Sequence, residues 1–125
     1  MAYYKNLEEY IRALDQEGLL YRVKRPINKD TEMHPLVRWQ FRGLGEDQRR
    51  AFYFEQVYDA KDKRYDMPVL IGGLAGSQRI YALGLNCRED EVEAIWAKAL
   101  ENPIEPVLVQ QGEVQELVYI GEELI

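Results

Sequence analysis

The chain has 125 residues, of which 46% are hydrophobic and 30% are charged, and its formal net charge is −6. This size and composition predict one globular domain that buries a core of its own without needing disulfides or a metal. The negative charge argues against nucleic acid and anionic lipid as partners, and no apolar run approaches the roughly 18 residues of a membrane span. The single cysteine, Cys87, cannot form an internal disulfide, which favours a cytoplasmic location.

The first predicted helix spans residues 7–17. Its apolar residues share one helical face, and they are Leu7, Tyr10, Ile11 and Leu14. Asn6 and Glu9 form a capping-box pattern, and Gly18 offers a left-handed C-terminal stop. Residues 19–23 then predict a strand that ends before Pro26.

The middle of the chain predicts a second helix and two strands. The helix is expected over residues 30–43 with Pro35 in its first turn, and one side of it is traced by Leu36, Trp39, Gln40 and Gly43. Residues 51–57 predict an aromatic-rich strand, and the polar residues 59–66 predict a turn or hairpin. Residues 68–71 predict a strand buried on both faces of a sheet.

The C-terminal part predicts two helices and a hairpin. Ser77 is expected to cap a helix that ends at Gly84, and Asn86 is expected to open a capping box with Glu89. A helix over residues 88–101 follows, with apolar residues at helical spacing: Val92, Ile95, Trp96, Ala99 and Leu100. Residues 107–109 and 114–120 predict two strands joined by a turn over 110–113. The fold class is therefore α/β (α+β), with a mixed sheet of about five strands covered by about four helices in a single domain.

Four groups of residues are candidates for chemistry, and the sequence favours a structural role for each. The loop at residues 72–77 has the strand-to-helix context of an anion site, but it lacks the lysine of a P-loop and the order of a dinucleotide fingerprint. His34 is the only histidine, so no second nitrogen ligand or oriented relay exists. Cys87 lies near a predicted helix start with Arg88 as its one nearby cation. The acidic runs at residues 89–91 and 122–123 are typical of helix first turns and solvated faces. No catalytic, cofactor-binding or metal-binding residue is assigned.

Several short phrases together resemble the N-terminal domain of the UbiD-like decarboxylases, which use prenylated FMN. They are NLEEYI at 6–11 with Gly18 and the strand that follows, FYFE at 52–55, YDMPVL at 65–70 leading to Gly76 and Ser77, NPIEP at 102–106, GEVQE at 112–116 and YIGE at 119–122. The resemblance covers essentially the whole chain, so residues 1–125 are expected to form the UbiD-like N-terminal domain. The apolar end at residues 124–125 is interpreted as a cut or as a boundary facing a missing partner.

The resemblance implies an enzyme that decarboxylates or carboxylates aromatic or unsaturated acids, with prenylated FMN and Mn²⁺ bound by other domains. None of the family's metal, flavin or Glu-Arg-Glu motifs occurs in this chain, which is therefore expected to be inactive alone. It is expected to be a fragment or small subunit that supports the flavin-binding domain within a homo-oligomer of the complete enzyme. Two alternatives stay open: a stand-alone anion- or protein-binding regulatory module, and an enzyme that uses Cys87 or His34.

Overall fold

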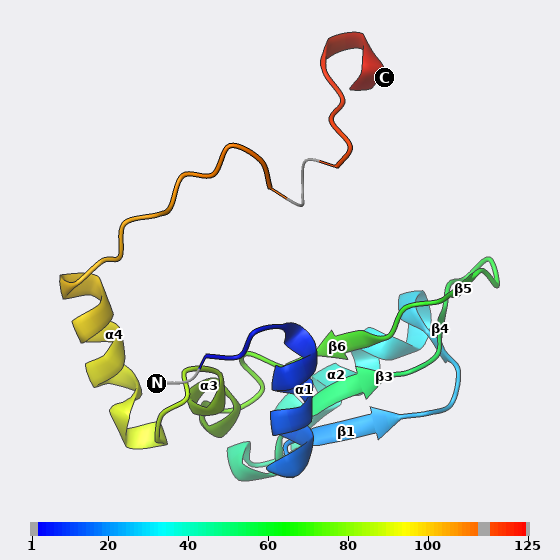
Figure 1. Ribbon diagram of the computed structural model, residues 1–125. Helices are drawn as coiled ribbons and strands as arrows, with labels where there is room; N and C mark the ends of the chain where they lie inside the picture. Colours follow the sequence, from blue (N-terminus) through cyan, green and yellow to red (C-terminus); the bar gives the residue numbers. More distant parts are fainter. Residues whose placement is uncertain (1–2, 113–115, 125) are drawn as a thin grey trace.

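The computed structural model describes residues 3–112 and 116–124 and shows helices on both faces of a mixed sheet (Figure 1). The sheet has the strand order β1-β3-β6 and consists of β1 (Leu20–Val23), β3 (Ala51–Phe54) and β6 (Val69–Ile71). β1 is parallel to β3, and β6 is antiparallel to it. Helices α1 (Leu7–Gln16) and α3 (Gln78–Gly84) cover one face, and α2 (His34–Gly43) covers the other.

A second, smaller sheet continues the first. Its strands β2 (Ile27–Asn28), β4 (Val57–Tyr58) and β5 (Arg64–Tyr65) have the order β2-β4-β5, with the same parallel and antiparallel pairings. The amide of Ile27 donates to the carbonyl of Gln56 at 3.0 Å, so pairing resumes directly after Pro26, which has no amide to donate. The predicted α/β class and the mixed sheet are confirmed, with the sheet divided into two three-stranded parts.

Side-chain alternation along β3 divides the core into two clusters. Phe52 and Phe54 face α2, where they pack with Met33, Val37, Ile27 and Val57. Ala51 faces the opposite side and packs with Tyr10, Leu14, Leu19 and Ile80. Because successive strand residues point to opposite faces, one short strand serves both clusters. β6 is half-buried instead of buried on both faces as predicted, because it lies at the edge of the sheet.

The predicted caps of α1 and α3 are confirmed. The Asn6 side chain accepts from the amide of Glu9 at 2.9 Å, and the Ser77 hydroxyl accepts from the amide of Ile80 at 3.2 Å. α2 follows a π-helical turn over Lys29–Met33 and carries Pro35 in its first turn, as predicted. A 3₁₀ turn over Glu46–Gln48 then leads into β3.

The helix at residues 88–101 is confirmed, but its cap is not the predicted one. It begins as a 3₁₀ turn over Glu89–Glu91 and continues as α4 (Val92–Glu101). Asn86 adopts a left-handed conformation with φ of 54°, and the cap residue is Arg88, whose amide donates to the Glu91 carboxylate at 2.9 Å. Left-handed backbone ends the preceding helix, which prevents Asn86 from starting the next one.

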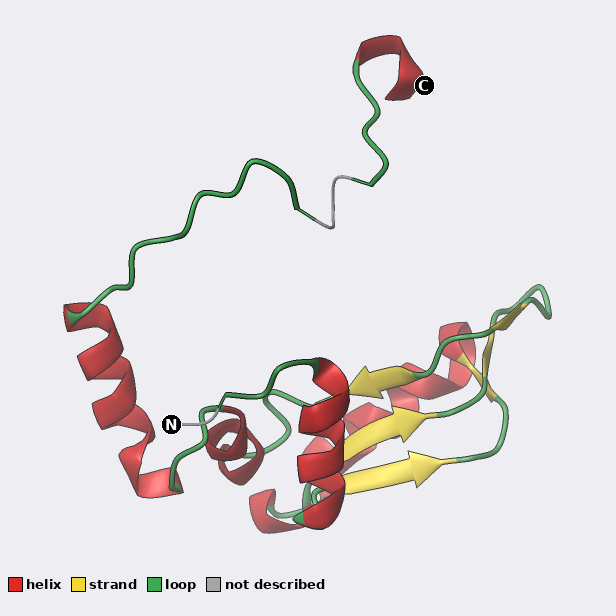
Figure 2. Cartoon of the chain, viewed as in Figure 1, coloured by secondary structure: helices red, strands yellow, loops and turns green. Residues whose placement is uncertain are grey.

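The predicted hairpin over residues 107–120 is wrong for the part of it that the structure describes. Residues 103–112 and 116–120 contain no strand and extend away from the sheets and helices (Figure 2). The rest of the predicted turn and strand, at 113–115, lies outside the described residues, and a 3₁₀ turn follows over Gly121–Leu124. The apolar, β-branched residues favour extended backbone, but a two-stranded hairpin is marginal without a surface to pack on. Within the described ranges, no helix has the length and hydrophobicity that crossing a membrane requires.

Candidate functional site

The glycine loop between β6 and α3 is a tight turn tied to the protein itself. Gly72 has a φ of 74°, and the amide of Gly76 donates to its carbonyl at 3.1 Å. A Cβ at Gly76 would lie 2.8 Å from that carbonyl oxygen, so the turn requires glycine. The Glu46 carboxylate accepts from the amide of Gln78 at 2.8 Å, in the first turn of α3. A side-chain carboxylate thus occupies a position where an external anion would bind, which supports the structural interpretation of this loop.

Tyr10 fastens this loop to the first helix. Its side chain is 5% exposed, and its hydroxyl lies 2.5 Å from the carbonyl oxygen of Gly73 and 3.1 Å from that of Ile80. Burial, with a smaller contribution from Tyr4, raises the pKa of Tyr10 to about 12. The hydroxyl therefore stays protonated at neutral pH and acts as a donor that joins α1, the glycine loop and α3.

The structure does not bring His34 and Cys87 together. His34 is exposed at the first residue of α2, whereas Cys87 follows α3 on the opposite side of the sheet. Burial raises the pKa of the Cys87 thiol, and the carboxylates of Glu91 and Asp90 raise it further. The neighbouring cation does not offset them, because Arg88 is bound to Asp90 through two hydrogen bonds of 3.0 and 2.9 Å. Cys87 therefore lacks the electropositive surroundings of a reactive cysteine.

Two carboxylates, Asp59 in the β4–β5 hairpin and Asp30 in the preceding π-helical turn, hold the hairpin in place. Asp59 accepts hydrogen bonds from the amides of Lys61 and Lys63 and from the Tyr65 hydroxyl, at 2.9 to 3.0 Å. Asp30 accepts from Lys29 at 2.7 Å and from the amide of Ala60 at 2.9 Å. Over residues 3–112 and 116–124, no three His, Cys, Asp or Glu side chains form a group able to hold a metal ion.

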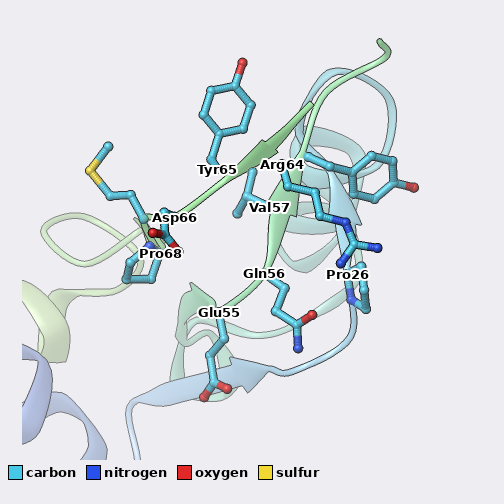
Figure 3. A pocket seen from close by; sticks show the side chains of 10 residues that line it. Pro26, Glu55, Gln56, Val57, Arg64, Tyr65, Asp66 and Pro68 are labelled. Carbon is cyan, nitrogen blue, oxygen red and sulfur yellow. The ribbon is translucent and has the colours of Figure 1, made fainter. Parts of the chain in front are cut away.

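A crevice of about 480 Å³ lies beside this hairpin (Figure 3). Its wall includes Pro26, Glu55, Gln56, Arg64 and Asp66. Figure 3 shows Arg64 on the same side of the hairpin as Pro26 and Gln56, whereas Tyr65 points to the other side of β5. Glu55 lies 3.6 Å from Arg22, and the Gln56 side chain donates to the carbonyl of Lys24 at 2.9 Å. These two polar groups therefore hold strand ends in place.

The second hollow is an apolar groove of about 540 Å³ that runs along α2 next to Phe52 of β3, and we call it the α2 groove. It is lined by Leu36, Trp39, Gln40, Arg42, Gly43, Leu44 and Phe52. The sequence put Trp39 and Gln40 on one side of this helix, but the Trp39 side chain is 73% exposed, and the buried α2 positions are Val37 and Gln40. Gln40 is buried because its Oε1 accepts from the amide of Arg50 at 2.9 Å. Sequence reasoning missed this groove, although a tryptophan and an arginine three residues apart on one helix are typical of binding surfaces.

α4 carries an apolar face that the rest of the described chain leaves uncovered. None of its residues is buried, and Trp96 and Leu100 are 46% and 76% exposed. The Trp96 indole donates to the Tyr81 hydroxyl at 2.7 Å, so the helix is attached to α3 by a polar contact. An amphipathic helix gains most of its stability from burying its apolar face, so this face fits a partner surface.

Comparison with known proteins shows which solved structures this chain is similar to. No protein-family model matches the sequence. The chain is similar to a solved structure of vanillic acid decarboxylase from Sedimentibacter hydroxybenzoicus, with 28% identity and a TM-score of 0.63. The match covers 85% of this chain and 21% of that one.

Two structures of the UbiD-class enzyme HmfF from Pelotomaculum thermopropionicum also match. The FMN complex has 25% identity and a TM-score of 0.55, and the match covers 82% of this chain and 20% of that one. The evolved dimeric form in complex with prFMN shares the fold at 24% identity and a TM-score of 0.58, over 85% of this chain and 22% of that one. The resemblance to UbiD-class decarboxylases is therefore confirmed, and the chain spans about a fifth of the length of the structures it matches.

Proposed function

We propose that this UbiD-like chain is the non-catalytic N-terminal domain of a prenylated-FMN-dependent enzyme that decarboxylates, or carboxylates, aromatic or unsaturated acids in the cytoplasm. The observation that carries the proposal is the match of 85% of this chain to only 21% of a vanillic acid decarboxylase chain. The remaining four-fifths of such an enzyme would hold the flavin and Mn²⁺ and perform the chemistry. Residues 1–125 would support that part and help to shape the substrate cleft.

The described residues fit a supporting role better than a cofactor site. The one histidine is exposed on α2, and the Asp59 and Asp30 carboxylates are already engaged with backbone amides, the Tyr65 hydroxyl and Lys29. The glycine loop, where a flavin phosphate would approach a helix N-terminus, is tied to Glu46. The described donors therefore do not fit Mn²⁺ or a flavin phosphate, and neither group is assigned to this chain.

The α4 face supplies the contact that the proposal needs. Trp96 and Leu100 expose apolar surface beside Ile95, which is half-buried. Aromatic and aliphatic side chains in such a patch are typical of interface centres. We infer that the flavin-binding part covers this face, either within one polypeptide or as a separate subunit, in a homo-oligomer of the complete enzyme.

The test consists of two experiments. In the first, the purified chain is mixed with prenylated FMN and Mn²⁺ and passed over gel filtration, and we expect no flavin absorbance to travel with the protein and no turnover of aromatic acids. Tight flavin binding, or turnover without a second chain, would contradict the proposal. In the second, the chain is co-expressed with the flavin-binding part supplied as a separate chain, and we expect co-purification.

In the second experiment, matched variants of α4 show whether its apolar face makes the contact with the flavin-binding part. Leu100→Asp places a charge in the exposed α4 face and should abolish co-purification. Glu93→Gln changes an exposed polar residue of the same helix and should preserve it. Loss of co-purification with both variants, or with neither, would contradict an interface at the apolar face of α4.

The alternative of a stand-alone anion-binding module has less support, because Glu46 already accepts from the amide of Gln78. Titration of the chain with inorganic phosphate tests it directly. Chemical-shift changes at the amides of residues 75–78 would favour that alternative over the supporting role.

A further inference from the structure

The net charge of the chain is concentrated at its C-terminal end. All 16 Lys and Arg residues lie within residues 1–98, together with 16 of the 22 Asp and Glu residues. Residues 101–125 contain six Glu and no basic residue, so they carry the whole formal charge of −6 while the rest of the chain is neutral. Such a charge asymmetry is typical of a segment that binds a basic surface.

The described part of this acidic segment is also apolar, and no other part of the described chain covers it. We call residues 103–124 the C-terminal arm, and the large apolar side chains whose burial the structure describes in it are 60% to 98% exposed: Ile104, Val107, Leu108, Val109, Leu117, Val118, Tyr119 and Ile120. In its described part, the arm extends away from the helices and sheets (Figure 2). An apolar surface of this extent needs a partner, and the glutamates between its apolar residues favour a basic one.

The α2 groove has the complementary chemistry. Its apolar wall includes Leu36, Trp39 and Leu44, and Arg42 lies at its rim. Arg38 lies one turn earlier on the same helix, and neither arginine forms an ion pair with any carboxylate that the structure describes. Two unpaired cations beside an exposed tryptophan suit a segment that combines glutamates with valine and leucine.

The groove and the arm of one chain lie on different sides of the molecule. The arm leaves from α4, which is attached to α3, whereas α2 covers the opposite face of the sheet (Figure 1). A second copy of the chain can present its arm to the groove without the arm crossing the sheet. If both copies do so, the two contacts are equivalent and the assembly closes as a two-fold dimer.

We propose that, in the chain on its own, the C-terminal arm of each copy docks into the α2 groove of a second copy, which forms a reciprocal arm-exchange dimer. The proposal does not rest on the enzyme-level function. A larger flavin-binding part that engages the arm would replace the second copy, so the two uses of the arm exclude each other.

Sedimentation of the chain over a range of concentrations tests the dimer. We expect a dimer whose Kd rises at least tenfold with Trp39→Ala, which removes the exposed groove aromatic. Gly43→Leu should have the same effect by filling the groove, since a Cβ at Gly43 meets nothing within 4 Å. Leu74→Ala, at a residue 70% exposed outside both surfaces, is the matched control and should leave the Kd unchanged. High salt should weaken the dimer because it screens the Glu–Arg attraction.

Mixing two variants that are each defective in dimerisation distinguishes a dimer formed by arm exchange from a dimer formed through another surface. The double variant Val107→Asp, Val109→Asp has a defective arm, and Trp39→Ala has a defective groove, so each alone should be monomeric at a concentration between the wild-type Kd and its own raised Kd. Their mixture retains one intact arm facing one intact groove and should form a heterodimer. A monomer at all concentrations, dimers in either variant alone, or no heterodimer in the mixture would each overturn the proposal. A second observation would also overturn it: the arm variant shifts the Trp39 indole NH resonance by the same amount at every protein concentration. Such a shift would show that the arm binds the groove of the same chain and not that of a second copy.

Discussion

Replacing Tyr10 with phenylalanine tests whether one hydroxyl joins the three elements around the glycine loop. The phenol oxygen lies 2.5 Å from the carbonyl of Gly73 and 3.1 Å from that of Ile80, and its residue is 5% exposed. Phenylalanine keeps the ring and its packing but leaves two carbonyls without this donor. We expect the free energy of unfolding at pH 7 to fall by about 1–2 kcal/mol, the usual loss for a buried hydrogen bond.

The pH dependence of the same variant gives a second measure. The pKa of Tyr10 is raised from 10.0 to about 12, so the unfolded chain loses this proton at a lower pH than the folded one. The stabilisation by Tyr10 is therefore complete below pH 10 and is lost as the pH rises toward 12. By pH 11 the wild type should lose about 1.4 kcal/mol that Tyr10→Phe does not lose.

Urea unfolding followed by circular dichroism, at pH 7 to 11, supplies both numbers. The difference in unfolding free energy between wild type and variant cancels the titration of other residues common to both chains. Equal stability at pH 7, or a difference that does not change between pH 9 and pH 11, would refute the proposed role of the hydroxyl.

Three further outcomes are expected. Gly76→Ala should destabilise the chain by about 1–3 kcal/mol in urea unfolding, because its Cβ meets the Gly72 carbonyl at 2.8 Å, whereas Gly43→Ala should not be destabilising. Cys87 should react slowly with iodoacetamide at pH 7.5 and faster only above pH 9, since its pKa is raised from 9.0; fast alkylation of the folded chain at pH 7.5 would contradict this. The Lys29 ammonium and the Ala60 amide lower the pKa of Asp30 from 3.8, so this carboxylate contributes stability above pH 3.8 that is lost as the pH falls through its folded-state pKa. The Ala60 amide resonance should titrate with a midpoint below 3.8, and a midpoint at or above 3.8 would contradict the hydrogen bond.

Local signals in the sequence predicted the helices and their ends where each signal acts within one turn. The side chains of Asn6 and Ser77 accept from amides three residues later, and Pro35 lies in the first turn of α2. All three features were predicted from the residues next to them in the sequence. The order of short phrases likewise led to the UbiD-like resemblance that the structural matches confirm. These signals depend on nearby residues, so a sequence contains them in full.

Positions that depend on distant residues were decided by the tertiary structure. The sequence predicted strands after residue 106, but extended backbone becomes a strand only when another strand pairs with it, and the described part of this segment has none. Helical spacing identified the apolar side of α2, yet it did not show that Val37 and Gln40 face the sheet while Trp39 lies outside. That choice depends on where Phe52 and the amide of Arg50 lie, and both residues follow the 3₁₀ turn that separates α2 from β3.

The chemistry divides in the same way. The sequence alone established that one histidine and one cysteine are available. Only the fold placed them on opposite sides of the sheet, raised the pKa of Cys87, and turned Glu46 onto the first turn of α3. Composition limits which groups a chain can offer, but hydrogen bonding and burial, which need long-range contacts, determine whether those groups meet and in what charge state.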